Sequence, residues 1–422
     1  MIETITIYPG ITLRCYPDHR FKHGCLSVQL IRPMCREEVA MNALLPAVLL
    51  RGSEDHRDLR DITLRLDELY GASVSALVRR VGDYQTTGLY CSFMEDKYAL
   101  PGDQVLQPMM EFLGELLFRP ILVDGGFHPG FVESEKKNLI ATIEADLNDK
   151  RAYAAGQMLK LMCSADSFGI PRLGEKEQVA TIDPKSLYSH YQKILRESRM
   201  ELFYVGSAPP ETVTALMKNL FGDLSRDYVN LPDQTAFHDG GSKGETVEQM
   251  DVAQGKLCMG LVTPITNRDP RFGAMQLCNT VLGAGMTSKL FMNVREKLSL
   301  CYSVGSGYHG SKGVVTISAG IDSKNMQIAK DEILRQLDAC RNGDITDAEL
   351  TAAKEAVYSS LRGTHDSPGA IEGYYSTAAL SGLVFSHSEY MTAVEETTLD
   401  QVVACANSLE LHTTYFLKGG SQ

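Results

Sequence analysis

The sequence predicts an α+β fold made of two duplicated domains, each a mixed β-sheet with helices on one face. Three observations lead to this prediction. Segments of alternating or β-rich composition are interleaved with segments of helical spacing. The same order of segments occurs twice, and a polar, glycine-containing stretch separates the two occurrences. The length of 422 residues also exceeds what a single compact core usually holds.

The first half of the chain alternates between the two kinds of segment. Strands are expected at residues 11–17, 25–32, 73–81, 86–93 and 200–207. Helices are expected at residues 37–50, 61–71, 104–118 and 209–221, with one long helix over 131–162.

The pattern restarts after residues 231–249, which are expected to form a linker because they are polar and contain several glycines. Strands are then expected at residues 256–264, 301–308 and 313–321, and helices at 271–283, 288–298, 326–343 and 346–363. A helix end running into a strand begins near residue 66 and again near residue 294, at the same point of each half. The predicted domains are therefore residues 1–230 and 250–422.

Composition excludes several classes of protein. A hydrophobic content of 44% with 22% charged residues indicates a packed globule. The net charge is −12 and the 41 basic residues form no run, so no nucleic-acid partner is expected. No apolar stretch reaches the roughly 18 residues of a membrane span, and the N-terminus lacks the features of a signal peptide. We therefore expect no membrane partner and a cytoplasmic location.

The ten cysteines are scattered and form no Cys-x-x-Cys pair, which argues against a zinc ribbon or a thioredoxin-like site. Most lie within apolar runs, so they are expected to be reduced and buried.

Two segments carry a resemblance to a known family. Residues 167–207 have a Gly-x-Pro-x-x-Gly start, a helical stretch and a strand that ends in Val-Gly. Residues 282–308 contain a glycine-rich loop, the run Ser-Lys-Leu-Phe, and Arg-Glu-Lys followed by Tyr-Ser. Both resemble the M16 (pitrilysin or insulinase-like) zinc metallopeptidases, and more closely the half-length M16B members that work as two-subunit clams. The resemblance spans almost the whole chain and implies two M16-like domains.

The zinc motif of that family is degenerate here. Active members carry His-x-x-Glu-His shortly before Lys-Gly-Thr, and Arg51-Gly52-Ser53 resembles that ending. This alignment places Ala43 and Ala47 at the two histidine positions and Pro46 at the position of the general base. Two histidines four apart on a helix can bind one zinc, and a glutamate beside them can deprotonate its water. Alanine and proline can do neither.

The third zinc ligand of the family, a glutamate on the long helix, aligns with Thr142. A slip of one or two residues would bring Glu144 to this position, but no slip restores the histidines. The sequence therefore predicts no metal site, no cofactor and no catalytic residue of its own.

The resemblance also implies substrate-binding residues. In the family, an arginine and a tyrosine seven apart hydrogen-bond the peptide near the scissile carbonyl, and Arg295 and Tyr302 match them. The alternative is that Arg295 is a surface ion-pair partner and Tyr302 packs on a helix. Gly283 and Gly285, in the glycine-rich loop, are expected near the peptide. The loop at residues 53–58, with Glu54, Asp55, His56 and Asp58, is interpreted as a solvated turn rather than a metal site.

These observations favour a catalytically inactive subunit. It would pair with a homologous M16 subunit that carries His-x-x-Glu-His, and the pair would enclose a chamber for a peptide or small protein substrate. One alternative is a stand-alone or homodimeric peptide-binding scaffold without protease activity, and another is an enzyme with unrelated chemistry. Residues 148–154 resemble the silent subgroup that is associated with modification of elongation factor P, which allows that role without requiring it.

Overall fold

The computed structural model describes residues 2–146, 148–222, 224–238 and 243–419. The chain forms two compact units of similar size. Unit 1 consists of Met1–Glu144, Pro171–Asp233 and His365–Thr377, and unit 2 consists of Ala145–Ile170, Gln234–Thr364 and Ala378–Gln422. Each unit therefore contains one segment that comes from the opposite half of the sequence.

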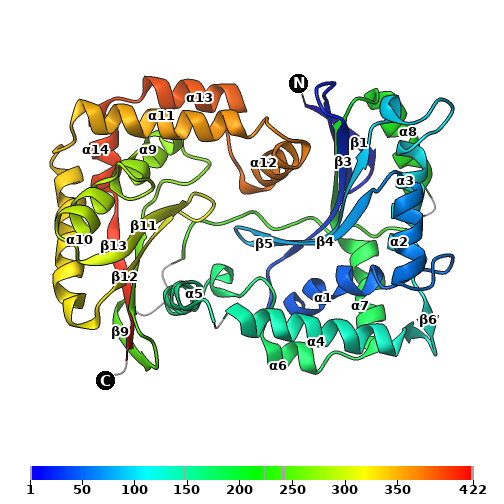
Figure 1. Ribbon diagram of the computed structural model, residues 1–422, viewed down its shortest axis with the longest axis horizontal. Coiled ribbons are helices and arrows are strands. Elements are labelled where there is room, and N and C mark those ends of the chain that lie inside the picture. Colours follow the sequence, from blue (N-terminus) through cyan, green and yellow to red (C-terminus); the bar gives the residue numbers. More distant parts are fainter. Residues whose placement is uncertain (1, 147, 223, 239–242, 420–422) are drawn as a thin grey trace. The chain divides into compact units, whose positions relative to one another are not determined.

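Unit 1 is built on a six-stranded sheet with the order β1-β2-β8-β3-β5-β4 (Figure 1). The strands are β1 (Glu3–Tyr8), β2 (Ile11–Pro17), β3 (His23–Pro33), β4 (Ser73–Val81), β5 (Tyr84–Met94) and β8 (Arg199–Gly206). Strands β2 and β8 run parallel, and the other neighbours are antiparallel. The sheet is therefore mixed, as predicted.

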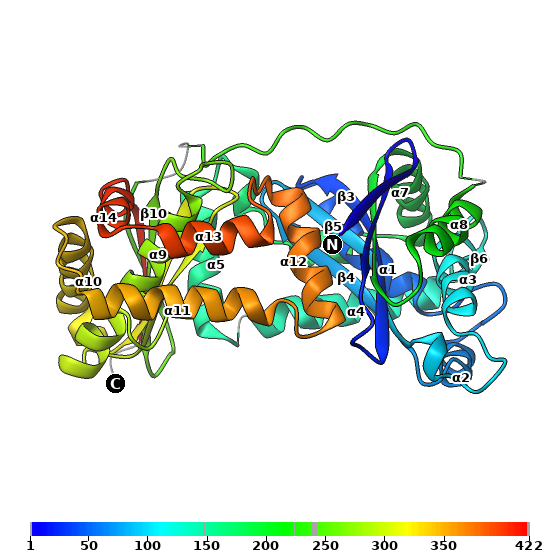
Figure 2. The same ribbon diagram turned by 90° about the horizontal axis from the view of Figure 1, so that it is seen from above.

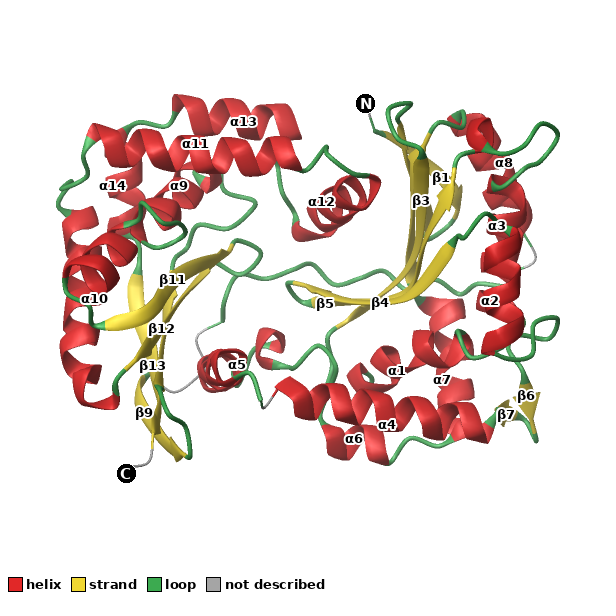
Figure 3. Cartoon of the chain, viewed as in Figure 1, coloured by secondary structure: helices red, strands yellow, loops and turns green. Residues whose placement is uncertain are grey.

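Helices cover one face of this sheet (Figure 3). They are α1 (Val39–Leu49), α2 (Leu59–Glu68), α3 (Leu106–Phe118), α4 (Pro129–Asp146), the short α6 (Lys176–Ala180), α7 (Pro184–Glu197) and α8 (Pro210–Phe221). A 3₁₀ turn, η1 (Asp96–Tyr98), and a small hairpin of β6 (Leu122–Val123) and β7 (Gly126–Phe127) complete this part. Leu26, Val28 and Leu30 of β3 point toward the helices and form the main core with them. Their spacing of two is what a strand needs to bury one face.

The other face of the same sheet receives a helix from the C-terminal half of the sequence. Cys25, Phe203 and Val205, which alternate with the core residues, form a second cluster with Ile371 of α12 (Pro368–Ser381). A helical segment therefore lies on each face of the sheet in unit 1.

A buried ionic group fixes α12 at this position. Glu372 has 0% exposure, and its carboxylate lies 2.9 Å from a guanidinium nitrogen of Arg79 on β4. It also accepts hydrogen bonds from Ser27 Oγ at 2.7 Å and Gln29 Nε2 at 2.8 Å, both on β3. A buried carboxylate needs such partners to offset its desolvation. These contacts therefore fix the position of α12 on the sheet.

Unit 2 is built on a five-stranded sheet with the order β11-β12-β10-β13-β9. The strands are β9 (Gly244–Met250), β10 (Gly255–Val262), β11 (Cys301–His309), β12 (Val314–Ile321) and β13 (Glu410–Gly419). Strands β13 and β9 run parallel, and the other neighbours are antiparallel. The predicted α+β class, with a mixed sheet in each of two similar halves, is confirmed.

The helices of unit 2 are α5 (Lys150–Met162), α9 (Phe272–Leu282), α10 (Met326–Arg341), α11 (Asp347–Gly363), α13 (His387–Glu396) and α14 (Leu399–Asn407). The unit also contains 3₁₀ turns η2 (Ser167–Gly169) and η4 (Ser323–Asn325), and a π-helix, η3 (Leu290–Lys297). Figure 2 shows α11 and α13 lying alongside one another.

Helix α5 comes from the N-terminal half of the sequence and packs on β10. Gly260 of β10 leaves room for it, because a Cβ there would lie 2.4 Å from Met162 Sδ and 2.7 Å from Met158 Sδ. The chain after α5 is held by a buried ion pair of 3.0 Å between Asp166 and Lys312. Asp166 also accepts a hydrogen bond from the backbone N–H of His238. These contacts hold His238 and the chain after α5 in unit 2.

Two predictions about elements differ from the structure. The single helix expected over 131–162 is divided into α4 and α5, because the Asp149 side chain accepts hydrogen bonds from the backbone N–H groups of Arg151 and Ala152 and so begins a new helix. The end of the expected linker, residues 231–249, forms strand β9 against β13, while residues 239–242 lie outside the described residues. The domain boundaries at 230 and 250 stay a prediction.

All ten cysteines are free, and all but Cys35 are buried, as expected. Burial raises the pKa of the Cys25 thiol to about 12, which keeps it protonated. Within the described ranges, no helix is long and apolar enough to cross a membrane.

Candidate functional site

Helix α1 is the element in which the sequence places the degenerate zinc motif. All of its residues except Met41 and Ala47 are buried. Pro46 lies inside the helix and removes one backbone donor, yet its own carbonyl still accepts the N–H of Leu50 at 3.2 Å. An almost wholly buried helix is a packing element, so α1 now serves as part of the core of unit 1.

None of the aligned positions offers a zinc ligand. Ala43 is 5% exposed and Ala47 is partly exposed, and neither carries a donor atom. Thr142 lies on the exposed side of α4, where its hydroxyl donates to the carbonyl of Asn138 one turn earlier at 2.9 Å. Glu144, the alternative ligand, lies 3.0 Å from Lys176 in an exposed ion pair. The residues present do not fit a zinc ion of the M16 type.

The polar side chain in α1 that does have partners is Asn42, which the sequence analysis did not single out. Its Nδ2 donates to Gln85 Oε1 on β5 at 2.9 Å, and its Oδ1 lies 2.7 Å from His190 Nε2 on α7. Its carbonyl accepts the hydroxyl of Thr87 at 2.6 Å. All four residues are buried, so this network joins α1, β5 and α7 inside unit 1.

His190 is neutral within this network. Burial lowers the pKa of its imidazole from 6.5 to about 4. The nearby cations Arg32 and Lys193 also lower this pKa, whereas the Glu38 carboxylate raises it. Since Asn42 Oδ1 is an acceptor, His190 holds its proton on Nε2 and donates it. The network therefore has a structural role. The sequence does not predict it, because its members are single polar residues on three separate elements.

The C-terminal end of α1 is tied to α4 by a second contact. Arg51 lies 3.3 Å from Glu135, and its guanidinium lies 5.8 Å from the ring centroid of Phe131. Across the described ranges, no group of three or more His, Cys, Asp and Glu side chains is arranged to hold a metal ion.

Arg295 and Tyr302, the two expected substrate-binding residues, both lie on the surface of unit 2. Arg295 is on the π-helix η3, with its side chain 40% exposed and its guanidinium 4.6 Å from the ring centroid of Phe291. Its nearest acid is Glu296, with an Nε to Oε1 distance of 3.6 Å. Tyr302 is 75% exposed at the start of β11. Of the expected alternative, the surface ion pair of Arg295 agrees with its contact to Glu296, whereas a Tyr302 packed against a helix does not agree with this exposure.

Three backbone irregularities surround these two residues. Eight residues in succession adopt the rare π conformation in η3, and Ser299 has a φ of 50°. The register of β11 against β12 then shifts between Cys301 and Ser303, so Tyr302 is the extra residue of a bulge. A π-helix and a positive φ at a residue other than glycine raise the free energy of the folded chain. A bulge redirects a side chain out of the regular alternation of the strand. Here they accompany the exposure of both side chains.

The glycine-rich loop lies next to β11. The carbonyl of Gly283 accepts the N–H of Ser306 at 3.0 Å. A Cβ at Gly283 would lie 2.6 Å from Ser306 Oγ, whereas a Cβ at Gly285 would meet no atom within 4 Å. Gly283 therefore leaves room for the side chains of Ser306 and Leu290, and Gly285 borders open space.

Comparison with known proteins identifies the family. A family model described as Peptidase M16 inactive domain matches residues 181–357. The Probable inactive metalloprotease YmfF of Bacillus subtilis is 30% identical over 410 residues, which cover 97% of this chain and 96% of that protein. The chain belongs to the peptidase M16 family. These matches show an inactive M16 peptidase homologue.

Other similar proteins include one that is called a zinc protease and two with crystal structures. The Uncharacterized zinc protease YmxG, also of Bacillus subtilis, is 26% identical over 57% of this chain and 59% of its own length. A conserved protein from Enterococcus faecalis has a crystal structure that matches with a TM-score of 0.92 and 27% identity, over 100% of this chain and 99% of that one. A peptidase M16 inactive domain from Pseudomonas fluorescens matches with a TM-score of 0.81 and 16% identity, over 100% and 98% of the two chains, which shows the shared M16 fold.

The loop at residues 53–58 keeps its acids exposed, in line with the solvated turn that the sequence favoured, and several of its side chains also have partners. His56 Nδ1 lies 2.8 Å from Glu115 Oε1 on α3, and Asp55 pairs with Arg119. Asp58 accepts hydrogen bonds from the N–H groups of Arg60 and Asp61 and so begins α2. This M16 chain therefore has an organised cluster of charged residues at this loop.

Proposed function

We propose that this chain is the non-catalytic subunit of a two-chain M16 peptidase. A homologue that carries His-x-x-Glu-His would supply the metal and the general base. The present chain would supply Arg295 and Tyr302 to the peptide in a shared chamber, with Gly283 and Gly285 beside it. We place this pair in the cytoplasm, on the sequence grounds given above.

The observation that carries the proposal is the contrast between the two M16 motifs. At the zinc motif, Ala43, Pro46 and Ala47 lie in a helix that is now almost wholly core. At the second motif, Arg295 and Tyr302 remain exposed, on backbone of unusual geometry. A supporting subunit needs only the second set, because its partner would supply the metal and the general base.

The chemistry of the exposed pair fits a supporting role. Peptide hydrolysis places negative charge on the carbonyl oxygen of the scissile bond. A guanidinium and a phenol hydroxyl are donors, and donors aimed at that oxygen stabilise the transition state. Neither group needs a metal ion in its own chain to do so.

The relatives in Bacillus subtilis are consistent with pairing. That organism has both a protein called a probable inactive metalloprotease and one called a zinc protease, and both are similar to this chain. By analogy, we propose that a zinc-bearing M16 homologue from the same source is the partner.

The test is reconstitution of the pair. The chain and the zinc-bearing homologue are purified separately, mixed and assayed with one fluorogenic peptide. Arg295→Ala or Tyr302→Phe should lower kcat by about 10²–10³-fold, without changing pair formation or the zinc content of the partner. Arg335→Ala is the matched control, because Arg335 is an exposed arginine of unit 2 outside the motif.

Two results would contradict the proposal. Wild-type rates from both variants would mean that the exposed pair is not used. Failure of the two chains to associate, with peptide binding by this chain alone, would favour the stand-alone scaffold.

A further inference from the structure

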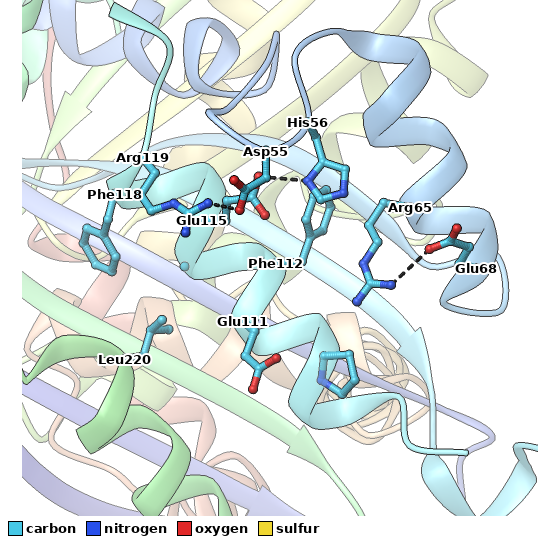
Figure 4. A pocket seen from close by; sticks show the side chains of 12 residues that line it. Asp55, His56, Arg65, Glu68, Glu111, Phe112, Glu115, Phe118, Arg119 and Leu220 are labelled. Atoms are coloured by element: carbon cyan, nitrogen blue, oxygen red, sulfur yellow. Dashed lines mark hydrogen bonds and ion pairs between the residues drawn. The ribbon is translucent and has the colours of Figure 1, made fainter. Parts of the chain in front are cut away.

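A surface cleft in unit 1 has no part in the proposed function. It lies between α2, α3 and α8 and has a volume of about 530 Å³ (Figure 4). Its lining combines the aromatic rings of Phe112 and Phe118 and the side chain of Leu220 with seven ionisable side chains. A cleft that joins an apolar wall to charged groups selects ligands by both properties.

The Nδ1 side of the His56 ring is held by contacts within unit 1. Glu115 Oε1 lies 2.8 Å from His56 Nδ1 and also accepts the hydroxyl of the buried Ser53. The ring packs edge-on against Phe112, with centroids 5.1 Å apart. Because an ionised carboxylate only accepts, Nδ1 is assigned the proton, and in the neutral imidazole the other ring nitrogen, Nε2, is a lone-pair acceptor. His56 lines the cleft, so this acceptor is available to a ligand that donates.

The two arginines of the cleft are already paired. Arg65 lies 3.0 Å from Glu68, and Arg119 pairs with Asp55. Each of these pairs is neutral as a whole, so neither offers net positive charge for an anion.

The remaining acids of the cleft are Glu111 and Glu115, which are four apart on α3 and so lie on one side of that helix. Glu111 receives a hydrogen bond from the neutral amide of Gln107 at 2.9 Å, and Glu115 receives those of Ser53 and His56. Within the described part of the chain, no lysine or arginine forms an ion pair with either carboxylate. The cleft therefore has a net negative charge that its own cations do not cancel.

We propose that this cleft binds an alkylammonium or guanidinium group carried on an apolar stem. The charged head would donate to Glu111 and to His56 Nε2, and the stem would lie against Phe112, Phe118 and Leu220. A lysine or arginine side chain of a polypeptide has this chemistry, and so does a free polyamine. The inference does not depend on the proposed function, since all the groups belong to unit 1 of the isolated chain.

The experiment measures binding to the purified full-length chain by NMR or calorimetry. The probes are Nα-acetyl-lysine N-methylamide, its norleucine counterpart and spermidine. The lysine derivative should bind and the norleucine derivative should not, because it has the same stem without the charge. Glu111→Gln should weaken binding about fivefold or more, since it removes a charge-assisted contact. Glu177→Gln is the matched control, an exposed acid of α6 outside the cleft, and should change nothing.

Each outcome decides the matter. Tighter binding of the lysine derivative than of spermidine would identify a polypeptide side chain as the source, and the reverse order a polyamine. Equal binding of the norleucine derivative, equal loss in Glu177→Gln, or no binding by any probe would overturn the proposal. Because no partner chain is present, failure here is separate from failure of the two-chain proposal.

Discussion

Acidification should destabilise unit 1 through a single buried histidine. His190 is 6% exposed and hydrogen-bonds Asn42 of α1. Burial lowers the pKa of its imidazole from 6.5 to about 4 in the folded chain. The unfolded chain therefore takes up the proton first. The stability due to neutral His190 is fully present above pH 6.5 and is lost as the pH falls toward 4.

The size of this effect follows from the two pKa values. One pKa unit corresponds to about 1.4 kcal/mol, so the full shift from 6.5 to about 4 corresponds to roughly 3 kcal/mol. Between pH 7 and pH 5 the expected loss is about 2 kcal/mol of the free energy of unfolding of unit 1. His190→Gln should lack this component while keeping an N–H donor for Asn42 Oδ1.

The assay compares urea unfolding at pH 7 and pH 5. Because the chain has two units and no tryptophan, amide exchange of peptides from β5 and α7 is a better probe than a global signal. For each protein, the loss of unfolding free energy between pH 7 and pH 5 is measured. The loss in the variant is then subtracted from the loss in the wild type. His23→Gln is the control, because His23 is an exposed histidine of the same unit. An equal loss in wild type and in His190→Gln would refute the reasoning.

Two further predictions concern the M16 motifs. The isolated chain should bind no stoichiometric zinc at α1 and α4, whereas the variant with Ala43→His, Pro46→Glu, Ala47→His and Thr142→Glu should bind it before any activity returns. Elemental analysis and calorimetry check this, and a folded variant without tightened zinc binding would mean that the helix is aligned wrongly. Gly283→Ala should cost about 1–3 kcal/mol of unit 2 stability, since its Cβ would lie 2.6 Å from Ser306 Oγ. Gly285→Ala should stay within about 0.5 kcal/mol, because its Cβ meets open space. Thermal unfolding of the matched pair measures the difference, and equal destabilisation by both would contradict it.

Local patterns in the sequence were enough for most of the fold. The expected strands at 73–81 and 86–93 correspond to β4 and β5, because runs rich in β-branched and aromatic residues favour strands. The division of the long helix was missed, although Asp149 was a readable signal for a new helix start. Strand β9 was missed because its pairing with β13 joins residues far apart in the chain.

The sequence also predicted less about the candidate site than about its individual residues. The motif in the sequence proposed Arg295 and Tyr302, and it did not predict the π-helix, the positive φ of Ser299 or the bulge that accompany their exposure. The partnership of His56 with Glu115 was also missed, since charged residues in a short loop look solvated until α3 is placed beside them. In each case the missing information is a tertiary contact.

The packing of α12 in unit 1 and of α5 in unit 2 affects what would happen if the chain were cut into two fragments. A fragment that ends at Asp233 would keep every strand of the first sheet but lose His365–Thr377. Cys25, Phe203 and Val205 would then face water, and Arg79 would lose its buried carboxylate. The complementary fragment would lack α5, which packs beside Gly260. The order of elements repeats as if the halves were independent modules, yet each half of the sequence contributes a helix to the other unit, so neither fragment would keep all the packing of its unit.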